Sequence, residues 1–162
     1  MVRRKEAQAS ALIITVVVLL LYFLKIPPDL VGLSSVSGFY TRFTYQFFHA
    51  SLLHAAINCW ALLSVVFIYD VSWRMILTGY IVSALFPISL LGTSIPTIGL
   101  SGLIYFLFGR ISLSVVRKVY FQGWMFFFIG VGFSFATTNA WMHLFCYVIG
   151  VFIAFLNKSI YR

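Results

Sequence analysis

The residues of this chain whose types could do chemistry gather near the N-terminal ends of three apolar stretches. The first stretch carries two histidines and an asparagine, the second a serine and the third a histidine: His49, His54, Asn58, Ser101 and His143. A neutral imidazole can take the proton from a serine hydroxyl and make that oxygen a nucleophile. Polar groups inside a membrane are costly and usually functional. The spacing therefore predicts one reaction site assembled from three helices.

Glycines surround the candidate nucleophile, Ser101, in the stretch Gly-Leu-Ser-Gly. Gly99 and Gly102 let other backbone approach closely, and the amide N–H groups at a helix start can bind an anion. His54 and Asn58 are four residues apart and so share one helix face, from which both could donate to a developing negative charge. These residues could supply a nucleophile and the donors of an oxyanion hole.

The acidic residues exclude several other mechanisms. Glu6, Asp29 and Asp70 are the only carboxylate side chains, and none lies inside an apolar stretch. A membrane aspartyl protease, a carboxylate proton relay and a metalloprotease with an H-E-x-x-H motif are thereby excluded. A Ser-His pair can work without a carboxylate when another group fixes the imidazole ring. Tyr105, one helical turn after Ser101, is well placed to be that group.

The composition places these residues in a membrane. Of the 162 residues, 62% are hydrophobic and 9% are charged, and the mean hydropathy is +1.05. A soluble domain has a far lower apolar share. Because a helical span needs about 20 apolar residues, with shorter ones tolerated, we expect one all-α polytopic membrane domain over residues 1–162. Its six predicted spans cover residues 7–24, 52–69, 75–91, 98–116, 124–137 and 140–156, and an outer-leaflet loop covers residues 25–48.

The basic residues predict the orientation of these spans. With cytoplasmic N- and C-termini, only Lys25 and Arg42 lie on the outer side of the membrane, and Arg110 snorkels towards the cytoplasmic side. The other basic residues all lie on the cytoplasmic side: Arg3, Arg4, Lys5, Arg74, Arg117, Lys118, Lys158 and Arg162. The net charge of +8 then reflects topology and contact with anionic membrane lipid, and it requires no nucleic acid partner.

In this topology the second, fourth and sixth spans all run from the outside to the inside. His54, Ser101 and His143 lie near the starts of these spans. At about 1.5 Å of rise per residue, each would sit roughly 6 to 10 Å below the outer surface. The three side chains can therefore meet.

Three sequence motifs follow one another along the chain. Residues 42–58 read Arg-Phe-Thr-Tyr-Gln-Phe-Phe-His-Ala-Ser-Leu-Leu-His-Ala-Ala-Ile-Asn, and residues 99–105 read Gly-Leu-Ser-Gly-Leu-Ile-Tyr. The third motif is His143 with Gly150 seven residues later. In content, order and span, the motifs resemble the second, fourth and sixth helices of the rhomboid family of intramembrane serine proteases. The resemblance covers the whole six-helix core and implies a rhomboid-like bundle of six transmembrane helices.

The resemblance also implies a role for each matching residue. Ser101 would be the nucleophile and His143 the general base, with Tyr105 supporting the base. His54 and Asn58, together with the backbone of Ser101, would be the oxyanion donors.

Further matches imply supporting roles. His49 looks like the family's structural histidine near the membrane surface, and Gly99 and Gly102 would support the nucleophile. Arg42 resembles the arginine of the family's W-R pair, although it is one residue out of register and follows no tryptophan.

Bulky residues flank the candidate base, where rhomboids have small residues that let the fourth and sixth helices approach closely. They are Trp141, Met142 and Cys146. Either the two helices pack further apart here, or glycines on the facing side compensate: Gly99, Gly102 and Gly109.

The expected function is hydrolysis of a peptide bond in or near the outer end of transmembrane protein substrates, with no cofactor and no metal. By analogy with the family, a bacterial cytoplasmic membrane is the expected location. One alternative is a catalytically silent relative that binds transmembrane helices. A second is a haem or metal protein with His54 and His143 as ligands, in which only Cys59 and Cys146 could complete a zinc site.

Overall fold

The computed structural model describes residues 2–90 and 95–160, and these form an all-helical protein. The longer helices are α1 (Val2–Phe23), α4 (Leu52–Ile68), α5 (Trp73–Ala84), α6 (Ser101–Ile111), α7 (Lys118–Gly132) and α8 (Ala140–Ile160). The short elements are α2 (Pro28–Val31), α3 (Thr41–Thr44) and the 3-10 helices η1 (Tyr45–Phe47) and η2 (Ile88–Leu90). The only β pairing within the described residues is an antiparallel bridge between Leu33 and Thr97. The prediction of an all-α protein is confirmed, with one longer helix at each of the six apolar stretches.

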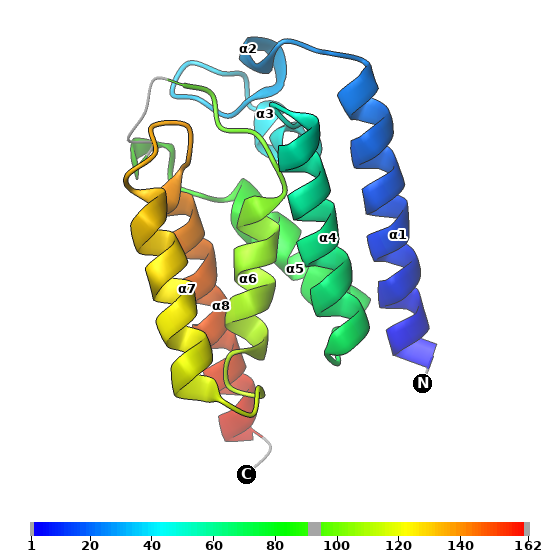
Figure 1. Cartoon of the computed structure of the whole chain (residues 1–162), viewed down its shortest axis with the longest axis vertical. Coiled ribbons are helices and arrows are strands. Elements are labelled where there is room, and N and C mark those ends of the chain that lie inside the picture. Colours follow the sequence, from blue (N-terminus) through cyan, green and yellow to red (C-terminus); the bar gives the residue numbers. More distant parts are fainter. Residues whose placement is uncertain (1, 91–94, 161–162) are drawn as a thin grey trace.

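The six longer helices stand side by side and alternate in direction (Figure 1). α1, α5 and α7 run away from the end at which both termini lie, and α4, α6 and α8 run back towards it. α6 is central, packed against α4, α5 and α8, and its buried residues occupy every face of the helix, as expected for a core helix. They include Leu103, Ile104, Phe106, Leu107 and Ile111. The starts of α4, α6 and α8, which carry the predicted site residues, share one half of the molecule.

Two helices are long and apolar enough to cross a membrane among the described residues: Arg4–Phe23 within α1 and Ala140–Asn157 within α8. A third crossing is possible if Thr41–Phe47 and α4, which are bent by 93° at the break between them, form one span. α6 is apolar but has 11 residues. At about 1.5 Å per residue its length is roughly half of a hydrocarbon core of about 30 Å. Hydropathy therefore located the six longer helices, but it overestimated the lengths of the third and fourth, predicted at 75–91 and 98–116. It also placed the fifth too late in the chain, at 124–137 instead of Lys118–Gly132.

Two helices, α5 and α6, end well before the predicted spans 75–91 and 98–116 end, each for a local reason. α5 ends at Ala84 because Pro87 disfavours helical backbone in the residue before it. α6 ends at Ile111, where the hydroxyls of Ser112 and Ser114 donate to carbonyl oxygens three residues back, at 2.8 and 2.7 Å. Such side-chain bonds compete with the backbone ladder of a helix.

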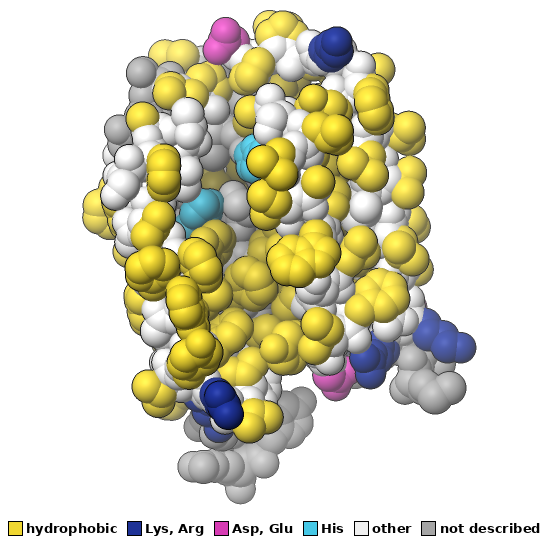
Figure 2. Space-filling view, in the orientation of Figure 1, with side chains coloured by type: hydrophobic (Ala, Val, Ile, Leu, Met, Phe, Trp, Pro, Cys, Tyr) yellow, Lys and Arg dark blue, Asp and Glu magenta, His cyan; other side chains and the backbone are white. Residues whose placement is uncertain are grey.

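Charged side chains lie towards the two ends of the bundle, and hydrophobic side chains cover the face between them (Figure 2). Arg110, near the end of α6, lies 3.0 and 3.3 Å from the side-chain amide of Asn157 on α8, whose oxygen accepts from both guanidinium nitrogens when it faces them. A guanidinium that reaches a polar partner at a helix end avoids the cost of a charge in the apolar layer. The distribution of charge is the one expected of helices that lie in a bilayer.

α6 and α8 pack backbone against backbone. A Cβ added to Gly109 would contact the carbonyl oxygen of Tyr147 and lie 3.0 Å from the Gly150 Cα, and one added to Gly150 would contact the carbonyl oxygen of Phe106. Small residues permit such an approach between membrane helices. Of the two arrangements left open by the sequence, the structure has the close one, with Gly109 and Gly150 at the contact.

The bulky neighbours of the candidate base do not obstruct this contact. Trp141 is 47% exposed and meets the ring of Phe133 edge-on, with centroids 5.1 Å apart. Met142 and Cys146 are buried, and the sulfur of Met142 lies 3.3 Å from where a Cβ on Gly102 would be. The glycine therefore makes room for the methionine.

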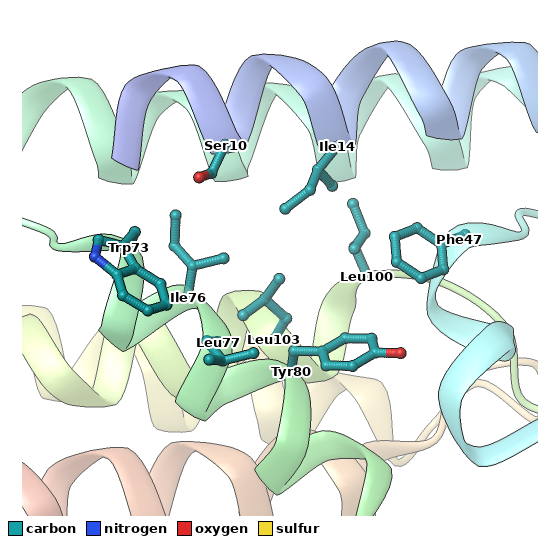
Figure 3. Close-up of a pocket in the computed structure, with 9 residues that line it drawn as sticks. All are labelled: Ser10, Ile14, Phe47, Trp73, Ile76, Leu77, Tyr80, Leu100 and Leu103. Carbon is teal, nitrogen blue, oxygen red and sulfur yellow. The ribbon is translucent and has the colours of Figure 1, made fainter. Parts of the chain in front are cut away.

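A cavity of about 250 Å³ separates α1 from α5 and the start of α6 (Figure 3). Most of its lining is apolar and comes from three helices and η1: Ser10, Ile14, Phe47, Trp73, Ile76, Leu77, Tyr80, Leu100 and Leu103. None of the predicted site residues lines it, so this cavity is separate from the candidate site.

Candidate active site

Ser101 and His143 lie within hydrogen-bonding distance of each other. Ser101 is the first residue of α6, and His143 lies one turn into α8. The Ser101 Oγ and the His143 Nε2 are 2.8 Å apart, which is the separation that direct proton transfer needs. Nε2 can accept the serine proton when the imidazole carries its own proton on Nδ1. The pair can therefore exchange a proton without any backbone movement.

The ring of Tyr105 lies nearly parallel to the imidazole of His143. The ring centroids are 4.3 Å apart and the planes differ by 17°. Tyr105 follows Ser101 by one turn, so the helix that carries the hydroxyl also carries the ring that faces the imidazole. This stack restricts rotation of His143, which is what a carboxylate does in a Ser-His-Asp triad.

Asn139 fixes the start of α8 relative to the segment before Ser101. Its Oδ1 accepts from the Met142 backbone N–H at 3.0 Å, and its Nδ2 donates to the Thr97 Oγ1 at 3.1 Å. Its carbonyl oxygen accepts from the backbone N–H of His143 at 3.2 Å. The role of Asn139 was not predicted from the sequence. Asparagine just before an apolar helix is a favoured N-cap, and this signal could have revealed it.

Gly99 holds an unusual backbone conformation beside two histidines. Its φ is +119°, in the region that favours glycine, and its N–H donates to the carbonyl oxygen of Tyr45 at 3.0 Å. A Cβ at this position would lie 2.9 and 3.0 Å from the Cε1 and Nε2 of His54, and 3.6 Å from the Cδ2 of His49. The absence of a side chain thus lets the Nε2 edge of His54 reach the backbone that leads to the nucleophile.

His49 contacts both the His54 ring and the backbone just before Ser101. Its ring meets that of His54 edge-on, with centroids 4.8 Å apart and an angle of 66°. Its Nε2 accepts from the backbone N–H of Leu100 at 3.4 Å. These contacts suit a residue that shapes the site rather than one that reacts.

The side chain of Asn58 is hydrogen-bonded to its own helix. Its Nδ2 donates to the carbonyl oxygen of His54 on its own helix, at 2.9 Å, and the residue is buried. Within the described part of the chain, no hydrogen bond joins Asn58 to Ser101 or His143. The amide has a second N–H, which Asn58 can donate to an oxyanion while it keeps this bond.

A buried hydroxyl cluster behind the dyad was not predicted. The Tyr45 hydroxyl lies 2.6 Å from the Ser83 Oγ, 3.1 Å from the Ser83 carbonyl oxygen and 3.4 Å from the Met142 sulfur. A Cβ on Gly102 would contact the Ser83 Oγ, so the cluster lies directly against the start of α6. No sequence pattern signals it, because its members come from three distant segments.

The site opens into a hollow. Figure 2 shows histidine side chains in the wall of a recess between α4 on one side and α7 and α8 on the other. Ser101 is half-buried. Among the described residues, no three His, Cys, Asp or Glu side chains come together as metal ligands do. The arrangement offers a nucleophile, a base, a ring that steadies the base, and a histidine beside the nucleophile backbone.

Comparison with models of known protein families gives no match, and a search of curated proteins gives none either.

Proposed function

We propose that this protein is an intramembrane serine endopeptidase similar to the rhomboid proteases. The observation that carries the proposal is the 2.8 Å separation of the Ser101 Oγ and the His143 Nε2 at the starts of two helices that run in the same direction. The stack of Tyr105 on His143 supports it. A protein that only binds helices has no need of a serine hydroxyl aligned on an imidazole.

In the proposed topology each of the six longer helices is one membrane span, and both termini are cytoplasmic. The position of both termini at one end of the bundle supports this arrangement. The short α6 is compatible with it because α4, α5 and α8 surround α6. Irregular backbone, such as the segment before Ser101, is tolerated at membrane depth where protein or a water-filled cavity encloses it. A bacterial cytoplasmic membrane is the proposed location.

Acylation follows from the geometry of the dyad. The Ser101 Oγ attacks the carbonyl carbon of the scissile bond, and the His143 Nε2 takes the hydroxyl proton as the new C–O bond forms. When the carbonyl re-forms, the C–N bond breaks and His143 passes its proton to the leaving amine nitrogen. The acyl part of the substrate is then an ester on Ser101.

Hydrolysis of this ester uses the same two residues in reverse. A water oxygen attacks the ester carbon while His143 takes a proton from that water. The C–O bond to Ser101 breaks, the proton returns to Oγ, and the free carboxylic acid leaves. The recess beside the histidines provides the route for water.

The negative charge on the carbonyl oxygen needs donors near Ser101. The backbone N–H groups in the first turn of α6 have no partner within the helix, and they can donate to an anion. His54 is the side-chain donor, because its Nε2 edge already lies against Gly99. The second amide N–H of Asn58 is a further donor.

The test of this proposal is cleavage of a reporter transmembrane segment by the purified protein, with Ser101→Ala as the control. We expect the wild type to cut the reporter near its outer end, at a bond identified by mass spectrometry. A wild type that binds the reporter but leaves it intact would support the silent helix-binding alternative instead.

Tyr105 offers a second test of the mechanism. Tyr105→Leu is expected to lower the turnover number about 3- to 10-fold, because a stacked aromatic pair contributes about 0.5–1.5 kcal/mol beyond buried area. Tyr105→Phe keeps the ring and is expected to retain most of the activity. Initial rates of reporter cleavage measure both, and equal rates for the two variants would show that the stack does not orient the base.

A further inference from the structure

Tyr45 is buried where the segment 41–47, formed by α3 and η1, meets the rest of the bundle. The side chain is 0% exposed. Its carbonyl oxygen accepts from Gly99 N–H at 3.0 Å, and its hydroxyl lies between Ser83 on α5 and Met142 on α8. One residue therefore contacts the segment before α6, the end of α5 and the start of α8.

Two of these contacts lead directly to the dyad. Gly99 precedes Ser101 by two residues, and its φ of +119° sets the direction in which the chain enters α6. Met142 immediately precedes His143, and its sulfur is 3.4 Å from the Tyr45 hydroxyl. A shift of Tyr45 would thus move the nucleophile, the base or both.

Both hydroxyls of the cluster, those of Tyr45 and Ser83, can donate a hydrogen bond at the same time. If the Ser83 Oγ donates to the Tyr45 oxygen across their 2.6 Å separation, the Tyr45 hydrogen remains available to the Met142 sulfur or to the Ser83 carbonyl oxygen. A buried hydroxyl that lost these partners would be costly. The Tyr45 hydroxyl therefore links α5, through Ser83, to α8, through Met142, and favours one relative position of the two helices.

Other side chains anchor the segment 41–47 to α5 without touching the dyad. Arg42 Nη1 donates to the carbonyl oxygens of Ala84 and Phe86 at 3.0 and 3.1 Å, at the end of α5. Gln46 Nε2 donates to the Tyr80 carbonyl oxygen at 3.1 Å. Anchoring of the segment is thus separable from the contacts of Tyr45.

Tyr80 provides a matched comparison for Tyr45. Its hydroxyl donates to the Phe43 carbonyl oxygen at 2.8 Å, and Figure 3 shows its ring at the α1–α5 cavity, with the hydroxyl directed towards the segment that carries Phe47. Tyr80 joins the same segment to the same helix, but within the described residues it makes no hydrogen bond to Gly99 or Met142.

We propose that Tyr45 is a positioning residue, which aligns Ser101 with His143 by holding Gly99 through its carbonyl oxygen and Met142 through its hydroxyl. This inference rests on the proposed protease function. It gives Tyr45 a role in catalytic alignment as well as in the fold.

The decisive variant is Tyr45→Phe, which removes the hydroxyl and keeps the ring and the carbonyl oxygen. We expect kcat for reporter cleavage to fall about 10-fold with KM unchanged, because a small misplacement of catalytic groups lowers the rate steeply without weakening substrate binding. The rate of Ser101 labelling by a fluorophosphonate should fall by a similar factor. Tyr80→Phe should leave kcat and the labelling rate within about twofold of the wild type, since its hydroxyl bonds to the Phe43 carbonyl oxygen and, among the described residues, to neither Gly99 nor Met142.

Met142→Leu is the second variant, since it removes the sulfur and nearly conserves volume. We expect its kcat to fall about threefold, in the same direction as that of Tyr45→Phe, because one acceptor of the cluster is lost. It also tests the inference if Tyr45→Phe does not fold, as judged by thermal unfolding.

The outcomes separate the inference from the function on which it rests. Tyr45→Phe and Met142→Leu with wild-type kcat, or Tyr45→Phe and Tyr80→Phe with equal losses, would overturn the positioning role while cleavage by the wild type stands. A folded wild type that neither cleaves the reporter nor labels at Ser101 would overturn the proposed function and the inference with it.

Discussion

Ser101→Ala and His143→Ala are each expected to lower reporter cleavage by about 10³-fold or more, and the double variant is expected to lower it no further. The reason is that the two groups act as one unit across a 2.8 Å contact. Once the hydroxyl is gone the imidazole has no proton to accept, and without the imidazole the hydroxyl is a weak nucleophile. Initial cleavage rates of the three variants measure this dependence.

Ser114→Ala is the matched control for the serine variant. Ser114 follows α6, and its hydroxyl donates to the carbonyl oxygen of Ile111, far along the chain from the dyad. It is expected to cleave at close to the wild-type rate. Losses in Ser101→Ala and His143→Ala that multiply in the double variant would contradict a dyad that works as one unit.

Gly150→Ala is expected to destabilise the protein and to lower cleavage more than about 10-fold. The added Cβ would contact the Phe106 carbonyl oxygen and lie 3.1 Å from both Arg110 N and Gly109 Cα, so α6 and α8 would have to separate. Overpacking of this kind costs about 1–3 kcal/mol, and His143 on α8 would move away from its partner on α6, where a displacement of about 1 Å can cost 10²-fold in rate. The thermal unfolding midpoint and the cleavage rate measure the two effects.

The control for this variant is Gly130→Ala on α7. A Cβ at Gly130 meets nothing within 4 Å, so the same chemical change is free of steric cost there. Its stability is expected to be unchanged or to rise by about 0.5–1 kcal/mol, because alanine is the better helix former. Equal destabilisation by the two substitutions would show that the glycine contact does not set the spacing of α6 and α8.

The features that could be predicted from the sequence are those that depend on local pattern. Apolar stretches located the six longer helices, because a run of apolar residues signals burial wherever it lies along the chain. The spacing of His54, Ser101 and His143 relative to helix starts predicted that their helix ends would share one half of the molecule. Helix ends were predicted less well, since they depend on details such as the Ser112 and Ser114 hydroxyls and on Pro87.

The features that could not be predicted arise from contacts between distant segments. Tyr45 reads as one aromatic among many in the predicted outer-leaflet loop, and only the fold brings it to Ser83 and Met142. The outward direction of Trp141 is likewise a property of the packed bundle. Arg42 matched a family arginine imperfectly, yet it holds the carbonyl oxygens at the end of α5, a partner that sequence spacing does not reveal.

Covalent labelling of the folded protein by a fluorophosphonate reports on the Ser101–His143 pair itself, because this reagent requires a serine hydroxyl activated by a base. We expect one adduct, located at Ser101 by mass spectrometry of the digested protein, and its loss in both Ser101→Ala and His143→Ala. Folded wild-type protein that stays unlabelled, or an adduct that persists in Ser101→Ala, would contradict the assignment of Ser101 and His143 as a catalytic dyad.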